Sequence, residues 1–451
     1  MASLMDIVWD TAAHILSAFG FRFGGLLLFL GHLVTKFELA NLPTDLLVDN
    51  FHLPEKYDYV IVGGGSAGCV LANRLSADQS KMVLLLEAGG MEDAFSQVPL
   101  FAPLLIGGKF DWKYLPEPQE YACLSMEHQR CPWARGMAMG GSSAINFMFY
   151  VRGNRRDYDI WRDDFGAHGW SYEDVLPHFR NIETSSVPDH DGPFSIPGSV
   201  EALAFVSTPY VNASLEFPDV EIVLQSLPSS AVPLEYYLTN MDLRKDVYDQ
   251  YFLPKRGHHG FALAPVMNRP KSRGYVKLRT ANPLDQPIID PMYLTHPQDL
   301  AVAVEGRFED EASQGAHFEH ITDHFQDAAS TRPRRVKIAL RLMETDAMRA
   351  LKAKPWDIPL DACYSAGPIW SDPYIACLVR HMAHTTWHAC CTCPMGSDER
   401  AVVDHRLRVR GLKSLRVVDA SVMPTIVTGN LNAPVMMIAD KAAAMIRQDN
   451  A

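Results

Sequence analysis

Short apolar runs, separated by polar and small residues, predict a mixed α/β protein. The runs Tyr59–Val62 and Met82–Leu86 enclose a segment with helical periodicity, which is the strand–helix–strand pattern of a parallel sheet. Alternating apolar and polar runs follow later in the chain, at Val220–Leu224, Gly260–Val266 and Gly274–Leu278. We therefore expect a parallel α/β sheet first and an antiparallel sheet after it.

Two further segments are predicted helices, Tyr172–Phe179 and Ala433–Ile446, the second because it is rich in strong helix formers. Asn430 and Asn432 precede the second helix and are candidate N-terminal caps, because an asparagine side chain can accept from the free N–H groups of a first helical turn. The run Leu415–Val418 is predicted to form one more short strand.

Two regions depart from this pattern. Residues 307–335 are acidic, rich in histidine and poor in aliphatic side chains, so we expect an inserted surface segment. Phe23–Gly31 is apolar but too short to span a bilayer. Its length suits a secretion signal, although Asp6 and Asp10 stand where basic residues are usual. Residues 1–54 are thus expected to be a secretion signal, a loose membrane anchor or an amphipathic leader helix.

Length and composition indicate a globular protein of two domains. The chain has 451 residues, of which 47% are hydrophobic and 21% charged. Its net charge of −12 argues against nucleic acid as a partner, because phosphates would be repelled. Cys123 and Cys131 flank a short polar loop and could pair in an oxidising compartment, with two free thiols as the alternative. A secreted or extracellular location is expected, with membrane association as the alternative.

The segment after the first predicted strand has the glycine spacing of a dinucleotide-binding turn. Gly63 allows the tight turn, Gly65 lets the backbone approach a diphosphate, and Gly68 lets helix and strand pack closely. Glu87 ends the next apolar run, where its carboxylate can accept from ribose hydroxyls. This pattern predicts a dinucleotide cofactor but does not separate FAD from NAD.

Two later clusters carry candidate chemistry. Gly136–Ser143 is glycine-rich and can approach a planar ring or a phosphate closely, and Asn146 follows it. Farther on, His384 and His388 stand four residues apart, upstream of three thiols. One hypothesis is a zinc site, although the spacing matches no common zinc motif. The other makes His388 a general base, because an imidazole can take a hydroxyl proton near neutral pH. The three thiols belong to Cys390, Cys391 and Cys393.

Four ordered motifs resemble the glucose-methanol-choline (GMC) oxidoreductase family, and most closely its insect FAD glucose dehydrogenase branch. They are VGGGSAG with LLEAGG, RG-x-x-MGGSSAIN-x-M-x-YVRG, TTWH-x-CCTC-x-MG, and LRVVDASVMPTIVTGN-x-NAP. The resemblance implies an FAD-binding Rossmann-type domain interleaved with an α+β substrate domain on an antiparallel sheet. The implied parts are residues 55–190 and 401–451 for the FAD domain, and 192–306 and 336–400 for the substrate domain.

The resemblance also implies roles for individual residues. His388 would be the base that takes the proton of a substrate alcohol or sugar while hydride passes to FAD, and Asn430 would orient the hydroxyl. A quinone or similar acceptor is implied in preference to oxygen. The implied FAD-binding residues are Gly63, Gly65, Ser66, Ala67, Gly68 and Glu87 in the ADP half, Ala138, Gly140, Gly141, Ser142, Asn146, Phe147, Met148 and Phe149 along the flavin, and Trp387 and Asp419.

The chain departs from the family pattern in three places. Met137 stands where the family usually has a basic residue. The central segment that carries further FAD-domain strands in the family is absent around Ser185–Gly192. Residues 307–335 interrupt a segment that is continuous in the family. A parallel sheet without those strands would expose apolar faces and open edges, so an alternative is a shortened protein that binds FAD weakly or not at all.

Overall fold

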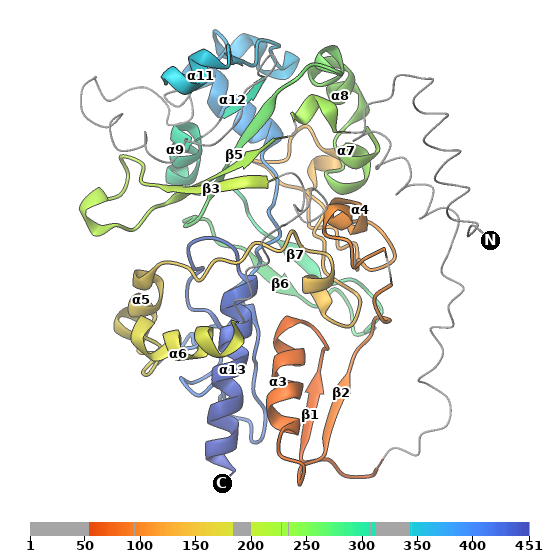
Figure 1. Ribbon diagram of the computed structural model, residues 1–451, viewed down its shortest axis with the longest axis vertical. Coiled ribbons are helices and arrows are strands. Elements are labelled where there is room, and N and C mark those ends of the chain that lie inside the picture. The colour runs from red at the N-terminus through yellow and green to blue at the C-terminus, as the bar shows by residue number, and fades with distance from the viewer. Residues whose placement is uncertain are drawn as a thin grey trace, which may run out of the picture.

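The computed structural model describes residues 54–183, 200–311 and 343–450, apart from the single positions 94, 227, 233, 307 and 344. Figure 1 shows two lobes, with the termini of the described chain in the lower one. The predicted leader before residue 54 and most of the predicted insertion at 307–335 lie outside the described residues.

The lower lobe begins with the predicted strand–helix–strand unit. Strands β1 (Tyr59–Val62) and β2 (Val83–Leu86) pair in parallel, and α3 (Ser66–Ser76) connects them. The C-terminal helix α13 (Asn432–Asp449) packs against α3 and α6 (Tyr172–Ile182), so the two ends of the described chain share one hydrophobic core. The predicted α/β fold class is confirmed. Helix α5 (Arg155–Phe165) completes this side of the core.

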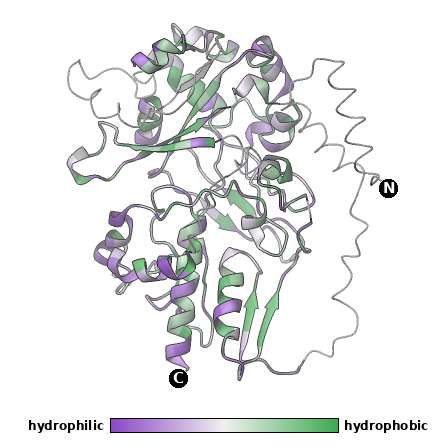
Figure 2. Ribbon diagram, in the orientation of Figure 1, coloured by the Kyte–Doolittle hydropathy of each residue, from purple (hydrophilic) through white to green (hydrophobic). Residues whose placement is uncertain are grey.

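The parallel sheet of this lobe has two strands within the described ranges, and its strands are open to solvent. Val62 is 82% exposed, Val60 56% and Leu86 44%. Figure 2 shows both strands as hydrophobic along their length. Parallel strands are normally covered on both faces. The exposed valines are therefore the structural consequence expected if further strands of this sheet are missing.

Asp440 connects α13, on which it lies, to α3 and α6. Its carboxylate accepts from Arg74 of α3 at 2.7 Å, and from His178 and Asn181 of α6 at 2.8 and 3.3 Å. Burial opposes ionisation, but the hydrogen bonds from His178, Arg74 and Asn181 win and hold the pKa of Asp440 at about 2. The network therefore stabilises the fold above about pH 4, and this contribution is lost as the pH falls toward 2.

We expect Asp440→Asn to lower the free energy of unfolding by about 2–4 kcal/mol, because it removes the buried charge with which Arg74 of α3 and His178 of α6 interact. Urea denaturation at pH 7 measures this. Asp163→Asn is the control, since Asp163 is 57% exposed and its ion pair is with the exposed Arg162; it should change stability by less than about 1 kcal/mol. Equal midpoints for the two variants would contradict the assignment.

The upper lobe is built on a five-stranded antiparallel sheet in the order β3–β4–β5–β8–β9. Leu263 and Phe261 of β5 pack with Val220 and Ile222 of β4 in its core. The predicted antiparallel sheet is thus confirmed. Its strands are β3 (Val200–Val206), β4 (Val220–Gln225), β5 (Phe261–Met267), β8 (Phe308–Glu311) and β9 (Lys354–Pro355).

Helices surround this sheet (Figure 1). α12 packs against α9, and α9 packs against β5. The helices of the upper lobe are α7 (Leu234–Asn240), α8 (Lys245–Tyr251), α9 (Pro297–Gly306), α11 (Asp346–Ala350) and α12 (Asp372–Met382), with the short α4 (Ala102–Leu105) lying between the lobes.

Three predicted elements differ in the structure. Phe308–Glu311, at the start of the predicted insertion, forms β8, because pairing with β5 outweighs its acidic composition. The run Gly274–Leu278 contains β6 (Tyr275–Lys277), which pairs with β7 (Ile288–Asp290) in a separate sheet. Leu415–Val418 forms only a bridge, between Arg408 and Arg416, with backbone hydrogen bonds from Val409 to Leu415 and from Val417 to Leu407.

Candidate functional site

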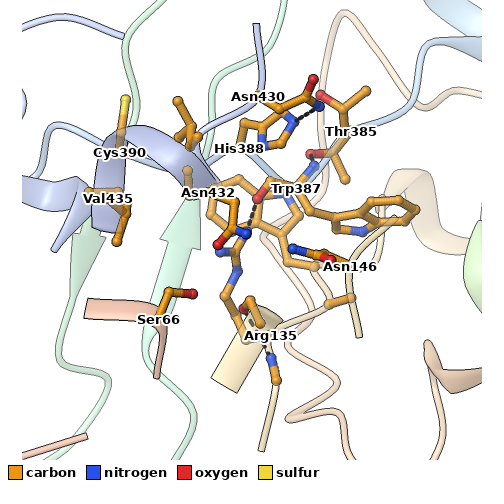
Figure 3. Close-up of a pocket in the computed structure, with 18 of the residues that line it drawn as sticks. Ser66, Arg135, Asn146, Thr385, Trp387, His388, Cys390, Asn430, Asn432 and Val435 are labelled. Carbon is orange, nitrogen blue, oxygen red and sulfur yellow. Dashed lines mark hydrogen bonds between the residues drawn. The ribbon is translucent and has the colours of Figure 1, made fainter. Parts of the chain in front are cut away.

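Side-chain hydroxyls join the three loops that the motifs predicted to meet. Ser66, at the start of α3, lies 2.5 Å from Ser143 of the second glycine cluster, measured between the two Oγ atoms. Ser143 in turn donates to Oδ1 of Asn432, the first residue of α13, at 3.0 Å. The N–H of Gly140 donates to the carbonyl of Gly64 at 2.7 Å. Two helix starts and one glycine loop therefore form a single wall (Figure 3).

The glycines in this wall are required by close backbone approach. A Cβ on Gly68 would lie 1.9 Å from the carbonyl oxygen of Gly63, and one on Gly141 would lie 2.7 Å from the Cα of Gly65. No side chain caps the start of α3 among the described residues. The free N–H groups of this first turn can therefore receive an anion, as a diphosphate would require.

Glu87 braces the same turn from the end of β2. Its Oε2 accepts from the N–H of Gly64 and its Oε1 from the N–H of Gly89, each at 2.7 Å. Each carboxylate oxygen has a second lone pair. The side chain can therefore hold the turn and still accept from hydroxyl groups of a nucleotide.

His388 and Asn430 form a pair at the centre of the site (Figure 3). The Nδ2 of Asn430 lies 2.9 Å from the Nε2 of His388. Burial, and then the positive charge of Arg135, lower the pKa of His388 to about 4. The imidazole is therefore neutral at physiological pH, so Nε2 accepts from the amide. The other amide atom, Oδ1 of Asn430, is buried without a hydrogen-bond partner in the described part of the chain.

Arg135 is a site residue that the sequence analysis missed. Its guanidinium donates to the backbone carbonyl of Trp387, next to His388, while its Nε is buried with no partner among the described residues. Burial lowers the pKa of Arg135. Met137 stands where the family usually has a basic residue, but the buried positive charge of Arg135 two residues earlier lies beside the imidazole. Only the tertiary fold reveals this proximity.

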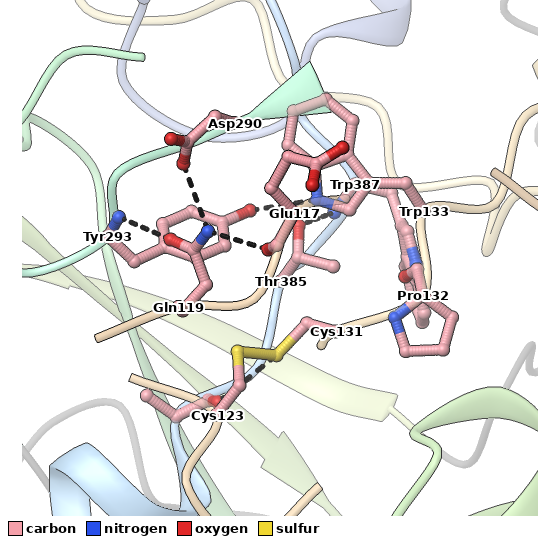
Figure 4. Close-up of a disulfide and its surroundings, with 11 residues drawn as sticks. Glu117, Gln119, Cys123, Cys131, Pro132, Trp133, Asp290, Tyr293, Thr385 and Trp387 are labelled. Carbon is pink, nitrogen blue, oxygen red and sulfur yellow. Dashed lines mark hydrogen bonds between the residues drawn. A yellow bond between two sulfur atoms is a disulfide. The ribbon is translucent and has the colours of Figure 1, made fainter. Parts of the chain in front are cut away.

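Trp387 is held in an unusual backbone conformation. Its φ is +61°, the left-handed region that a bulky side chain rarely adopts. Its indole N–H donates to the carbonyl of Pro132 at 3.1 Å, and its ring stacks nearly parallel on Phe147. Pro132 follows the disulfide Cys123–Cys131, which Figure 4 shows beside this segment. The predicted cysteine pairing is confirmed, and it supports the segment that precedes His388.

The loop that carries Asn430 is anchored from both lobes. Asp157 of α5 accepts from the N–H of Thr428 at 2.8 Å and from its hydroxyl at 3.1 Å. Asn268, just after β5, accepts from the N–H of Gly429 at 3.2 Å. Burial raises the pKa of Asp157 to about 6, although the N–H groups of Thr428 and Asn154 oppose the rise. Asn430 is thus positioned by hydrogen bonds from its loop to two buried side chains, Asp157 and Asn268, which no motif revealed.

Most predicted site residues line one continuous cavity of about 4360 Å³. It extends from the exposed side of β1 to the sheet of the upper lobe and exceeds the ~300–1,000 Å³ of an ordinary ligand pocket. The predicted residues in its wall are Gly63, Gly65, Ser66, Ala67, Gly68, Glu87, Gly141, Ser142, Asn146, Phe147, Met148, Phe149, Trp387, His388, Asp419 and Asn430.

Several predicted positions lie elsewhere or act differently. Ala138 is fully buried and Gly140 bonds to Gly64, and neither lines the cavity. Asn146–Phe149, implied to be a strand along the flavin, is irregular. Neither asparagine caps α13 as predicted, because Asn430 pairs with His388 and Asn432 with Ser143.

The zinc hypothesis finds no support. His384, His388 and the nearby thiols do not gather within ligand distance of one another in the described residues. Among the described residues, the side chains that do lie within ligand distance of one another are Cys363, Cys377 and His381. Because Cys363 and Cys377 form a disulfide, their sulfurs are not thiolate ligands.

Comparisons with known proteins cover most of the chain. Two family models, both described as GMC oxidoreductase, match residues 57–240 and 270–439. Glucose dehydrogenase [FAD, quinone] of Drosophila melanogaster is 26% identical, over 87% of each chain. Oxygen-dependent choline dehydrogenase of Burkholderia ambifaria is 29% identical, over 87% of this chain and 94% of its own. Pyridoxine 4-oxidase from Mesorbium loti has the same fold, with a TM-score of 0.60 and 20% identity, over 87% of this chain and 99% of its own.

The alignments also bear on the shortened sheet. The match to the Drosophila melanogaster protein runs over 575 positions, more than the 451 residues of this chain. That relative therefore has segments for which this chain has no counterpart. Together with the exposed strands β1 and β2, this agrees with the absence of a central segment.

Proposed function

This chain belongs to the GMC oxidoreductase family, and on that premise we propose that it oxidises the CH–OH group of a small alcohol or sugar with FAD. The observation that carries the proposal is the buried, neutral imidazole of His388, paired with Asn430 in the cavity that the dinucleotide-binding turn also lines. A neutral imidazole is ready to take a hydroxyl proton.

The residues present fit FAD. The free N–H groups at the start of α3 suit its diphosphate, and the carboxylate of Glu87 suits a ribose hydroxyl. The start of α13 lacks a side-chain cap within the described residues and lines the same cavity, so its dipole would favour negative charge on the flavin ring. When bound, FAD would supply the two-electron acceptor for the hydride of the carbinol carbon.

His388 would accept the proton of the substrate hydroxyl, and Asn430 would position its oxygen. The hydroxyl would replace the amide at Nε2 of His388, so that the imidazole takes its proton as the C–H bond breaks. The Nδ2–H of Asn430 could then donate to the substrate oxygen. Arg135 would hold the carbonyl of Trp387 and thereby the backbone beside His388. Its charge disfavours a proton on the resting imidazole.

A dye-linked assay tests this function. The purified protein, loaded with FAD, is offered a panel of primary and secondary alcohols, sugars and choline, together with a quinone, an artificial dye or oxygen. We expect turnover with at least one alcohol, and faster reoxidation by the quinone or dye than by oxygen, because the relative from Drosophila melanogaster is named for a quinone acceptor. A protein that holds FAD but turns over no CH–OH compound would contradict the proposal.

The lowered pKa of His388 predicts the pH dependence of this activity. The base works when unprotonated, so kcat/KM with a monohydric alcohol should fall on the acid side near pH 4, where the pKa of the free enzyme lies. An imidazole with its ordinary pKa would give a fall near pH 6.5. Steady-state profiles from pH 4 to 8, with circular dichroism to verify folding, distinguish the two. A midpoint near 6.5 would show that His388 is not the buried base described.

A second candidate is a protein with the same site and impaired FAD binding. The exposed valines of β1 favour it, since the open side of the sheet forms part of the cavity wall. Equilibrium dialysis against FAD measures the affinity. One flavin retained per chain after dialysis would refute this candidate, whereas a chain that releases its flavin would support it.

We propose that the protein is secreted or extracellular. Two disulfides, Cys123–Cys131 and Cys363–Cys377, favour an oxidising compartment, and the second was not predicted from the sequence. Among the helices that the structure describes, none has the length and hydropathy needed to cross a bilayer. We expect alkylation of the denatured, unreduced protein to label only the remaining cysteines, and mass spectrometry measures this. Labelling of all eight cysteines without reductant would contradict the pairing. The remaining cysteines are Cys69, Cys390, Cys391 and Cys393.

A further inference from the structure

The face of the upper sheet that lines the cavity carries a buried acid. Along β4, Val220, Ile222 and Leu224 pack into the core of the upper lobe. Because strand side chains alternate, Glu221 and Val223 project from the opposite face, and both line the cavity. Phe205, the cross-strand partner of Glu221, contacts the loop at Gly429, so the acid is on the face of the sheet turned toward that loop.

Glu221 has apolar neighbours and an unused oxygen. It is only 2% exposed, and its Oε1 meets no hydrogen-bond partner in the part of the chain that the structure describes. Phe205 on β3 and Val266 on β5 are its direct cross-strand partners. Burial raises the pKa of Glu221 to about 7. A buried carboxyl without a partner destabilises a fold. A ligand that donates a hydrogen bond to this carboxyl would offset that cost.

Residues on both sides of Glu221 contact the loop that carries Asn430. Phe205 carbons lie 3.3 and 3.4 Å from the position that a Cβ on Gly429 would take. Asn268 stands two residues beyond Val266 and accepts from the N–H of Gly429 at 3.2 Å. Two residues of a strand span only about 6.6 Å. Both cross-strand neighbours of Glu221 are thus linked to the loop that bears Asn430.

We propose that Glu221 is a substrate-binding residue that accepts a hydrogen bond from a second hydroxyl group of the alcohol, so that the enzyme prefers polyols to monohydric alcohols. This inference rests on the proposed function, because it requires the reacting hydroxyl to lie at His388. The second hydroxyl would satisfy the carboxyl oxygen that is otherwise buried alone.

A hydroxyl is favoured over an ammonium group as the ligand. Phe205 and Val266 give the carboxyl apolar surroundings, and bringing an ion pair into such surroundings carries a large desolvation cost. A hydroxyl donor adds no charge and can bond to the carboxyl in either protonation state. A preference for an amino alcohol over the matching diol would overturn this assignment.

The test compares butan-1-ol with butane-1,4-diol, and hexan-1-ol with hexane-1,6-diol, in wild type, Glu221→Leu and Glu221→Gln. For at least one pair, we expect Glu221→Leu to lower the diol-to-alcohol ratio of kcat/KM by about 10- to 100-fold, because it removes the acceptor. Glu221→Gln keeps an acceptor oxygen and should stay within about threefold of wild type. Glu201→Gln on the exposed side of β3 is the control and should change neither rate.

Two further readouts separate the possible failures. Calorimetric titration of diol into wild type and Glu221→Leu measures binding without turnover, and equal affinities would overturn the inference. Melting should show Glu221→Leu at least as stable as wild type, because a lone buried carboxyl is removed; a loss of stability would indicate a structural role instead. If FAD-loaded wild type oxidises none of these alcohols or the wider panel, the proposed function itself fails.

Discussion

His388→Ala is expected to lower kcat for alcohol oxidation by about 10²–10⁴-fold, while the bound FAD stays at the wild-type level. The imidazole is the neutral base of the site, because burial and Arg135 lower its pKa to about 4. Its removal leaves the hydroxyl proton without an acceptor. The loss should appear in kcat and in kcat/KM together, as expected for an interaction made in the transition state.

His388→Gln separates proton transfer from positioning. A glutamine can still hydrogen-bond to Asn430 but cannot take up the proton at this pH, so it should lose as much activity as alanine. His384→Gln is the matched control, since His384 is also a buried imidazole with a pKa of about 4 but lies outside the pair with Asn430. It should retain turnover within about tenfold. Equal activity in the two glutamine variants would remove His388 from the mechanism.

Gly68→Ala is expected to raise the dissociation constant for FAD by at least about 100-fold. The added Cβ would lie 1.9 Å from the carbonyl oxygen of Gly63 and 3.0 Å from its carbonyl carbon. Both contacts are with backbone, which cannot rotate away as a flexible side chain can. The start of α3 must therefore move away from the turn, and its free N–H groups lose their alignment with a diphosphate.

Gly90→Ala is the control for this glycine. A Cβ on Gly90 would meet no described atom within 4 Å, and its φ lies outside the left-handed region. Fluorescence titration with FAD measures both affinities. We expect Gly90→Ala to bind like wild type and Gly68→Ala to bind weakly even where circular dichroism shows it folded. Unchanged affinity in Gly68→Ala would contradict the placement of the diphosphate at this turn.

Local chain geometry explains which features were predictable from the sequence. The turn at Gly63–Gly68 and the position of Glu87 depend on residues close together in the chain, so their spacing was informative. The helix α13 was also predictable, because its residues include many strong helix formers. The pairing of His388 with Asn430 joins residues 42 apart and was expected only from the family resemblance.

Tertiary partners decided what the sequence pattern could not. The proximity of Arg135 to His388, and of Asn268 to Gly429, joins segments that no local pattern relates. Leu415–Val418 has the composition of a strand, but its pairing with Leu407–Val409 is limited to a single bridge. Glu221 occupies an ordinary place in an alternating strand, and the sequence gives no sign that it is buried with an unpartnered oxygen, which the tertiary structure shows.

Anaerobic mixing of the FAD-loaded protein with excess alcohol or sugar, followed by flavin absorption, is the most direct measurement of hydride transfer at this site. We expect one flavin per chain to lose its oxidised absorption with an active substrate, and His388→Ala to keep that absorption on the same time scale. Wild type that remains oxidised with every CH–OH compound offered, despite a full complement of FAD, would contradict the account.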